Sequence, residues 1–339
     1  MKRLDVHSTA ALLRAASRVL ILGHVQPDGD CLGSMTALSL GLEAIGTQTD
    51  VWSGDAVPVK YRFIAGNIQQ PSRELAGAHD LIAIVDTPTL ARVGINPEFV
   101  HTGAPLLSID HHPLGRDEFT YAFNDVSQAA AGCLVYEVLR ELGAPITRNI
   151  GNALYAAIIT DTGCFTYQNV NRRVLEIVIE LIDAGVDVYD IARTIYSSAS
   201  VGQMRLLGLT LNTLELVGNG KGAVMHVSRD MFAREQLAAA DTEDFVNFGR
   251  AILGVEVAAM VSEMPDGTLR LSLRSKRPLY DVSKLAKQFH GGGHPGAAGA
   301  LVREPLPAFL DKLKERITAF IERAEHAKHT RKGPHEHGT

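Results

Sequence analysis

The sequence has few cysteines and lacks any long apolar run. Its three cysteines, Cys31, Cys133 and Cys164, occur singly, so there is no C-x-x-C pair of the kind that holds zinc. An odd number of scattered thiols cannot form a closed set of disulfides, which predicts a reducing compartment, the cytoplasm. No apolar run approaches the roughly 20 residues that a membrane helix needs. These absences argue against a disulfide-stapled secreted protein and against a membrane protein.

The chain also lacks a surplus of basic residues. Its formal net charge is −5, so it does not provide the strong positive field expected of a protein that binds long nucleic acids. Residues 267–294 depart from this balance, with six basic side chains against Asp281 alone. The six are Arg270, Arg274, Lys276, Arg277, Lys284 and Lys287. A segment with that charge suits a small anionic ligand.

Length and apolar patterning predict an α/β protein of two domains. A single hydrophobic core stops growing near about 250–300 residues, and this chain has 339. Apolar runs at 19–22 and 49–52 enclose a loop and a helical pattern over 32–45, which together form a βαβ unit. Near-continuous apolar runs such as 81–85 are typical of a parallel sheet covered on both faces. Ligands of such a sheet bind outside the carboxyl ends of its strands.

A helical segment is expected to separate the two domains. The pattern over 188–216 predicts one helix, long enough to act as connector and hinge. Paired strands and a closing helix then indicate a smaller α/β domain. The expected boundaries are 1–185 for the parallel-sheet domain, 186–216 for the helical linker, 217–325 for the second domain and 326–339 for a polar tail expected to be disordered.

Acidic and histidine residues gather where four apolar segments end. They are His24, Asp28 and Asp30; Asp86; Asp110, His111 and His112; and Asp161. A buried carboxylate is costly unless it is paired or binds a metal. Carboxylates with a few imidazoles and no thiolate cluster suit two Mn²⁺ ions, with Mg²⁺ as a substitute. Two such ions sharing a carboxylate and a bridging hydroxide predict phosphoester hydrolysis. The alternative is that the aspartates belong to ordinary turns and helix caps.

Four segments resemble, in order and spacing, the motifs of the DHH phosphoesterase superfamily. They are GHVQPDGDCLGS (23–34), VDT (85–87), SIDHH (108–112) and TDTGCF (160–165). Downstream, LSLRSK (271–276) and FHGGGHPGAAG (289–299) are similar to the signature of the DHH-associated C-terminal domain. In length and in this pairing, the chain is most similar to the NrnA-like subfamily. Its members are nano-RNases, or oligoribonucleases, that also dephosphorylate adenosine 3′,5′-bisphosphate.

The resemblance implies a role for each residue of the four motifs. One Mn²⁺ would be held by His24, Asp28 and Asp86, and the other by Asp30, Asp86, His111 and Asp161. Asp86 would bridge the two ions, and Asp110 would orient His111 as an acceptor. His112 would face the scissile phosphate as a stabiliser or proton donor.

The second domain is expected to bind the substrate in a cleft between the domains. Gly291, Gly292 and Gly293 can bring backbone N–H groups close to a phosphate. In the RSK run Arg274 is followed by Ser275 and Lys276, and Arg274 and His294 would clamp the anion or stack on a base. The alternative is a tight turn before a strand at 298–302. This chain has His290 where the family pattern usually shows glycine, which affects the base pocket.

The predicted function is Mn²⁺-dependent hydrolysis of short RNA or DNA oligonucleotides to mononucleotides, together with dephosphorylation of adenosine 3′,5′-bisphosphate. Alternatives are a RecJ-like single-strand exonuclease, a phosphodiesterase for linear pApA, an inorganic pyrophosphatase and a nucleotide-binding sensor. The sequence leaves open the preferred substrate, the polarity of attack and the oligomeric state, for which a homodimer is one arrangement.

Overall fold

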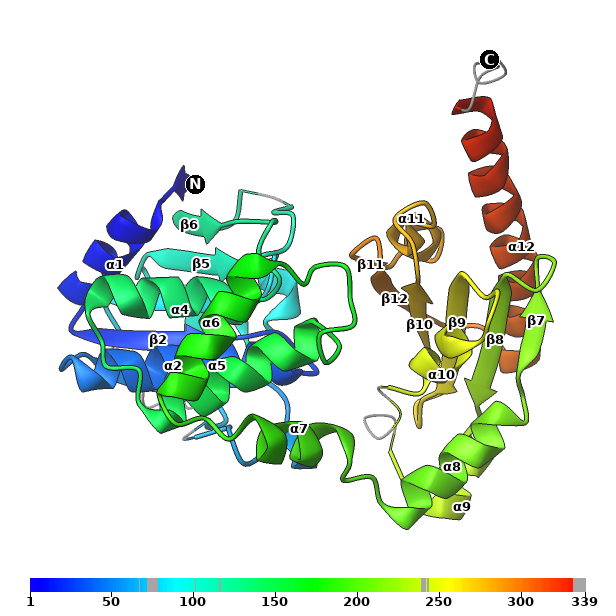
Figure 1. Ribbon diagram of the computed structural model, residues 1–339, viewed down its shortest axis with the longest axis horizontal. Helices are drawn as coiled ribbons and strands as arrows, with labels where there is room; N and C mark the ends of the chain where they lie inside the picture. The colour runs from blue at the N-terminus through cyan, green and yellow to red at the C-terminus, as the bar shows by residue number, and fades with distance from the viewer. Residues whose placement is uncertain are drawn as a thin grey trace, which may run out of the picture. The chain divides into compact units, whose positions relative to one another are not determined.

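The computed structural model describes residues 1–66, 68–71, 79–100, 102–115, 117–238, 242 and 244–331. The chain divides into two compact units, Met1–Ser198 and Ala199–Thr339 (Figure 1). The division between the units falls inside the segment predicted as the linker. Among the described residues, no helix has the length and apolar character needed to cross a membrane.

The first unit is built on a sheet of six parallel strands in the order β1-β6-β5-β4-β2-β3. The strands are β1 (Lys2–Arg3), β2 (Arg18–Leu22), β3 (Gln48–Trp52), β4 (Leu81–Val85), β5 (Leu106–Asp110) and β6 (Tyr121–Asn124). This confirms the predicted parallel sheet. Because β4 lies between β2 and β5, the segments that follow these three strands meet at one edge of the sheet.

Helices cover one face of this sheet, and residues before and after β5, including Val93, Ile95 and Phe119, pack on the other. The elements are α1 (Val6–Ala15), α2 (Gly29–Ala44), α3 (Pro97–Val100), α4 (Ala131–Leu142), α5 (Arg148–Asp161), α6 (Arg172–Asp183), α7 (Val188–Tyr196) and the 3₁₀ turns η1 (Val59–Tyr61) and η2 (Leu90–Arg92). In Figure 1, α2, α4 and α5 lie together against the sheet. The closest approach is at Gly33, where an added Cβ would lie 2.3 Å from the Ala153 carbonyl oxygen. Only glycine therefore lets α2 and α5 pack this closely.

The single helix predicted over 188–216 is wrong. Instead, α7 ends at Tyr196, α8 (Val201–Leu211) begins after a break, and residues 215–217 form a strand. The Ser200 side chain accepts the Gln203 N–H, and the Gln203 side chain accepts the Ser200 N–H. This reciprocal capping box satisfies the first backbone donors of a new helix and so stabilises a helix start at this point.

The second unit contains a mixed sheet of six strands in the order β11-β12-β10-β9-β8-β7. The strands are β7 (Glu215–Val217), β8 (Gly222–Val227), β9 (Val257–Glu263), β10 (Leu269–Ser275), β11 (Gly292–Gly293) and β12 (Ala297–Val302). Its helices, besides α8, are α9 (Arg229–Glu235), α10 (Val246–Ala251), α11 (Val282–Lys287) and α12 (Leu306–Arg331). Only β8 and β9 pair in parallel, because α9 and α10 connect them. The predicted α/β character of this domain is confirmed.

The last helix extends beyond its predicted end at 325. α12 continues to Arg331, so residues 326–331, predicted as part of the tail, are helical. The rest of the predicted tail, 332–339, lies outside the described residues.

Candidate metal centre

The four acidic segments converge at the carboxyl edge of the first sheet. His24, Asp28 and Asp30 lie at the junction of β2 and α2, and Asp86 directly follows β4. Asp110, His111 and His112 lie at the end of β5, and Asp161 is the last residue of α5. Parallel strands that neighbour one another place their carboxyl ends side by side, which brings together residues more than a hundred positions apart.

Asp86 lies between two groups of side chains. Its Oδ2 is 3.4 Å from His24 Nε2, and its Oδ1 is 3.5 Å from His111 Nε2. The residue is only 2% exposed, and Oδ1 accepts no hydrogen bond from any described residue. Its φ of +54° is left-handed, which costs about 1 kcal/mol or more and is most often found at functional sites. A buried carboxylate held this way fits a ligand shared by two cations.

The first group consists of His24, Cys31 and Asp86, whose ligand atoms lie within 4.8 Å of one another. His24 Nδ1 contacts the Val25 carbonyl oxygen at 2.8 Å, which directs Nε2 to the group. Asp28 Oδ1 is 3.8 Å from His24 Nε2, and it also accepts the Cys31 N–H at 3.0 Å as the N-cap of α2. The sequence motifs therefore identified the histidine and the carboxylates of this group but not Cys31.

The second group consists of Asp30, His111 and Asp161, again within 4.8 Å of one another. His111 Nε2 is 3.7 Å from Asp30 Oδ2 and 3.4 Å from Asp161 Oδ2. The N-cap residue of α4, Ala130, has no side-chain cap, and Asp30 takes that role from another helix. It accepts the N–H groups of Ala131 at 2.7 Å and of residue 132 at 2.9 Å. This pairing explains how a carboxylate 1% exposed is held in place.

The electrostatics show an excess of buried negative charge. Burial and the charges of Asp86 and Asp161 hold the pKa of Asp30 well above its usual range. Burial, reinforced by Asp86 and opposed by His111, raises the pKa of Asp161 to about 7. Burial alone would lower the pKa of His111, yet the Asp86 and Asp161 carboxylates raise it to about 11. Burial also acts to raise the pKa of Asp86, but the adjacent His111 and His24 imidazoles hold it well below its usual range. The raised pKa values show that these carboxylates need positive charge nearby. Divalent cations can provide that charge in place of the protons.

Asp110 contacts a different histidine from the one expected. Its Oδ1 accepts from the His112 ring, Nδ1 at 2.8 Å, and from the His112 backbone N–H at 3.1 Å. The partner of His111 Nδ1 is the Gln128 carbonyl oxygen, at 3.2 Å. The expected pairing of Asp110 with His111 is therefore corrected, because the tight turn after β5 folds the residue two positions on back over the carboxylate. Asn124 fixes this turn by donating to the carbonyl oxygens of Asp110 and His112.

Asn169 is a positioning residue that the sequence did not reveal. Its Nδ2 donates to the carbonyl oxygens of Ala129 and Asp161, both at 2.9 Å. It thereby ties the end of α5 to the segment that precedes α4 and holds His111. No motif marks it, because a side-chain amide that satisfies two carbonyl groups has no sequence pattern of its own.

The basic segment of the second unit is partly neutralised. Arg277 forms an ion pair with Glu256, and Lys284 pairs with Asp281. Lys276 Nζ donates to the carbonyl oxygen of Ile252 at 2.8 Å. Glu256 lies outside the basic stretch in sequence, so the local surplus counted along the chain overstates the charge in space.

Arg274 and Ser275 lie on β10, and the glycine run lies at β11, with β12 between these two strands. Arg274 on β10 is half-buried, and its guanidinium donates to the Leu273 carbonyl oxygen at 3.1 Å. Ser275 is buried, and its hydroxyl donates to the Pro295 carbonyl oxygen at 3.1 Å, so it holds the loop that carries His294. The segment 292–293 forms the edge strand β11 in a hairpin with β12, which is the turn that the sequence left as an alternative.

His290 adopts a left-handed backbone with φ +58°. Glycine takes this conformation without strain, whereas a side chain bearing a Cβ does not. The departure from the family pattern therefore occurs at a position with a steric preference for glycine.

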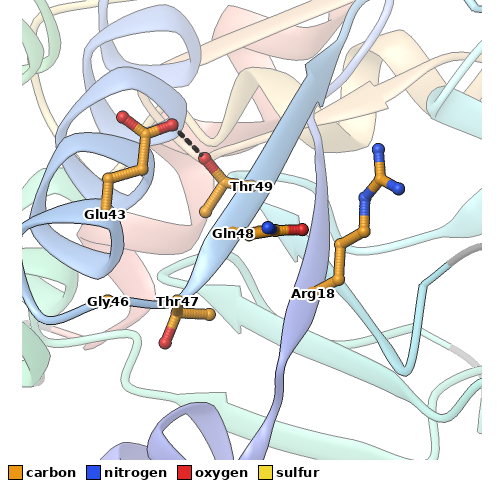
Figure 2. Close-up of a pocket in the computed structure, with 6 residues that line it drawn as sticks. All are labelled: Arg18, Glu43, Gly46, Thr47, Gln48 and Thr49. Carbon is orange, nitrogen blue, oxygen red and sulfur yellow. Dashed lines mark hydrogen bonds between the residues drawn. The ribbon is translucent and has the colours of Figure 1, made fainter.

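A shallow pocket lies at the opposite edge of the first sheet. Figure 2 shows its lining, in which Arg18 begins β2 and Gln48 begins β3, and Thr49 donates to Glu43 at 2.7 Å. The amino ends of these strands face away from their carboxyl ends, so the pocket is separate from the metal centre.

A parallel α/β sheet with carboxylate and imidazole groups at its carboxyl edge defines the class of metal-dependent phosphoester hydrolases. Residues 18–158 match the DHH family, N-terminal domain, and residues 219–323 match the DHHA1 domain. The chain therefore contains a DHH domain followed by a DHHA1 domain. The family is metal-dependent, and the two buried groups can bind metal ions.

Curated relatives extend over most of the chain. The bifunctional oligoribonuclease and PAP phosphatase NrnA of Thermus thermophilus is 29% identical over 306 residues, covering 89% of each chain. The protein of the same name from Bacillus subtilis is 25% identical over 287 residues, covering 84% of this chain and 89% of its own.

Solved structures share the fold. An exopolyphosphatase-related protein from Bacteroides fragilis superposes with a TM-score of 0.87 at 24% identity, covering 94% of this chain and 97% of that one. RecJ of Thermus thermophilus, in complex with Mn²⁺, has a TM-score of 0.56 at 15% identity and covers 94% of this chain and 55% of its own.

Proposed function

We propose that this protein hydrolyses short oligonucleotides to mononucleotides and also removes a phosphate from adenosine 3′,5′-bisphosphate. The observation that carries the proposal is the Asp86 carboxylate, which lies between the His24 and His111 groups. Further support comes from relatives named as bifunctional oligoribonucleases and PAP phosphatases, whose similarity spans both domains.

The proposed cofactor is a pair of Mn²⁺ ions, with Mg²⁺ as a substitute. The donors are mainly carboxylates with two imidazoles, a set that suits these ions. Asp28 and His24 would hold one ion, Asp30, His111 and Asp161 the other, and Asp86 both. When bound, such a pair stabilises charge on phosphoryl oxygens and lowers the pKa of water.

The protein's own side chains would provide orientation and proton transfer. Asp110 holds the His112 ring through Nδ1, so proton donation to the leaving oxygen is assigned to Nε2. The His112 side chain is 14% exposed, compared with 5% for His111, in keeping with a group that meets the substrate rather than a buried ligand. Asn124 fixes the turn that carries both residues.

The second unit is proposed to bind the substrate through Arg274, Lys276, His294 and the glycines at 291–293. His294→Ala is expected to raise KM for a dinucleotide by about tenfold or more and to leave kcat within a few-fold, since the histidine would bind a remote part of the substrate. His7→Ala provides the control, because His7 is an exposed histidine of the first unit. An unchanged KM in the His294 variant would contradict the assignment.

A substrate panel tests the proposed function. The protein would be incubated with Mn²⁺ and, separately, a labelled dinucleotide, a 24-mer, adenosine 3′,5′-bisphosphate and pyrophosphate. Preferred cleavage of the dinucleotide, with release of phosphate from the bisphosphate, is expected. Faster cleavage of the 24-mer would indicate a RecJ-like exonuclease, and cleavage of pyrophosphate alone a pyrophosphatase. Nucleotide binding without turnover, independent of Mn²⁺, would indicate a sensor.

We also propose a cytoplasmic location and a homodimeric assembly. All three cysteines are free thiols, which fits the reducing cytoplasm. A homodimer stays a prediction, and light scattering at several protein concentrations would test it.

A further inference from the structure

Cys31 lies where the main hydrophobic core meets the first ligand group. It is the third residue of α2, fully buried, and its Sγ lies within 4.8 Å of the ligand atoms of His24 and Asp86. Space for the sulfur depends on Gly23, where an added Cβ would lie 2.2 Å from Sγ. Outside the group, Sγ contacts the Met35 sulfur at 3.7 Å.

The other two cysteines have different surroundings. Cys133 is also fully buried and belongs to the same hydrophobic core, but it is part of no ligand group found among the described residues. Cys164 is exposed. Cys31 is thus the cysteine whose sulfur shares a site with an imidazole and a carboxylate.

Two further features direct Cys31 and its neighbours to one point. The Cys31 backbone N–H donates to Asp28 Oδ1 at 3.0 Å, so the residue that would contribute sulfur also positions a carboxylate of the same group. The buried Asp86 carboxylate faces the same group through Oδ2, which lies 3.4 Å from His24 Nε2. A tetrahedral zinc ion bound at about 2.3 Å from sulfur and about 2.1 Å from nitrogen places these two atoms about 3.6 Å apart. The atoms of the group lie within 4.8 Å of one another, so a contraction of about 1 Å or less would bring them to that distance.

We propose that the Cys31 thiolate ligates the metal ion at His24, Asp28 and Asp86 and makes this position prefer a thiophilic divalent ion, such as Zn²⁺ or Co²⁺. The group formed by Asp30, His111 and Asp161 contains no sulfur and keeps the preference for Mn²⁺ or Mg²⁺. On binding, the S–H bond breaks, a sulfur–metal bond forms and the proton passes to water. This inference rests on the proposed metal centre and adds that its two positions differ in metal selectivity.

The test is a Co²⁺ titration of the metal-free full-length protein. Thiolate ligation to Co²⁺ gives a near-ultraviolet charge-transfer band, whereas nitrogen and oxygen ligands give only the weaker visible bands. Wild type is expected to show the charge-transfer band within the first two equivalents. Cys31→Ala and Cys31→Ser should lose this band and keep the visible bands. Cys133→Ala and Cys164→Ala should keep both, which excludes a signal from either of the other thiols.

A competition measurement provides a second readout. By isothermal titration, Cys31→Ser should bind Zn²⁺ at least roughly tenfold more weakly, because even indirect contacts to a metal are worth that much. Its Mn²⁺ affinity should stay within a few-fold of wild type. The serine variant preserves side-chain size, and circular dichroism shows whether each variant folds.

The outcomes separate this inference from the proposed function. If wild type binds two Co²⁺ ions with visible bands but no charge-transfer band, Cys31 is not a ligand, while the metal centre stands. An equal loss of Zn²⁺ and Mn²⁺ affinity in Cys31→Ser would also overturn the proposed selectivity. If wild type binds no Co²⁺ and no Mn²⁺, the metal centre itself is wrong.

Discussion

Asp86→Asn is expected to weaken both metal positions at once. The substitution keeps the size of the side chain, and asparagine, like aspartate, tolerates the left-handed backbone at φ +54°. The substitution removes the negative charge of the carboxylate. In the native protein Oδ2 of this carboxylate lies 3.4 Å from His24 Nε2, and Oδ1 lies 3.5 Å from His111 Nε2. The effect therefore reports on the bridge rather than on folding.

The size of the effect follows from the number of ions contacted. If each ion loses roughly 10–100-fold in affinity, the amount associated with even outer contacts, the product of the two binding constants falls by about 10²–10⁴-fold. That range corresponds to about 3–5 kcal/mol. Asp28→Asn is the matched control, because Asp28 approaches only the first group, at 3.8 Å from His24, and asparagine also caps helices well. It should lose about 10–100-fold in one constant.

Isothermal titration with Mn²⁺ and dinucleotide turnover at saturating Mn²⁺ provide the assay. Asp86→Asn should lose affinity for two ions and Asp28→Asn for one, and the first variant should remain the less active. Equal losses in the two variants would refute a shared carboxylate at Asp86.

Three further predictions concern chemistry, pH and packing. His112→Asn should lower kcat by about 10²–10⁴-fold, as loss of an acid catalyst does, with Mn²⁺ affinity unchanged by titration; equal weakening of Mn²⁺ binding would instead make it a ligand. Apparent Mn²⁺ affinity should rise with pH, most steeply below about 7, because the raised pKa of Asp161 means that the ion must displace its proton there; a titration series from pH 6 to 8 measures this, and a flat profile would contradict it. Gly33→Ala should lower the free energy of unfolding by about 1–3 kcal/mol in urea, since its Cβ would meet the Ala153 carbonyl. Gly208→Ala, in a helix with open space around it, should be neutral or stabilising by up to about 1 kcal/mol. Equal effects of the two glycine substitutions would contradict the close packing of α2 and α5.

The metal-centre residues were predictable because their positions follow from a simple rule of parallel sheets. Asp86 and Asp110 follow apolar runs, and neighbouring parallel strands bring such ends together whatever their separation in sequence. Apolar residues at helical spacing over 150–158, after the N-cap Thr147, make α5 and the position of Asp161 at its end similarly visible in the sequence.

Other features depend on contacts that no spacing records. The position of the Cys31 sulfur depends on the rotation of α2 and on the missing Cβ at residue 23, neither of which a motif displays. The pairing of Asp110 with His112 depends on the turn after β5. Glu256, which directly precedes β9, neutralises part of the basic segment, and this too appears only in three dimensions.

The break between α7 and α8 does have a signal in the sequence. Ser200 and Gln203 form a capping box, which begins a new helix, α8. Apolar periodicity alone predicted a single helix through 188–216. The helical spacing of apolar residues is present on both sides of the break, because α7 and α8 are both helices. The cap is therefore the sequence feature that distinguishes two helices from one.

The most direct test of the central claim is a Mn²⁺ titration of the metal-free protein followed at once by electron paramagnetic resonance and by dinucleotide turnover. Two ions that share the Asp86 carboxylate should produce a spin-coupled signal, and turnover should appear only as the second equivalent binds. Full activity with one ion bound, or two ions without spin coupling, would contradict the proposed two-metal centre.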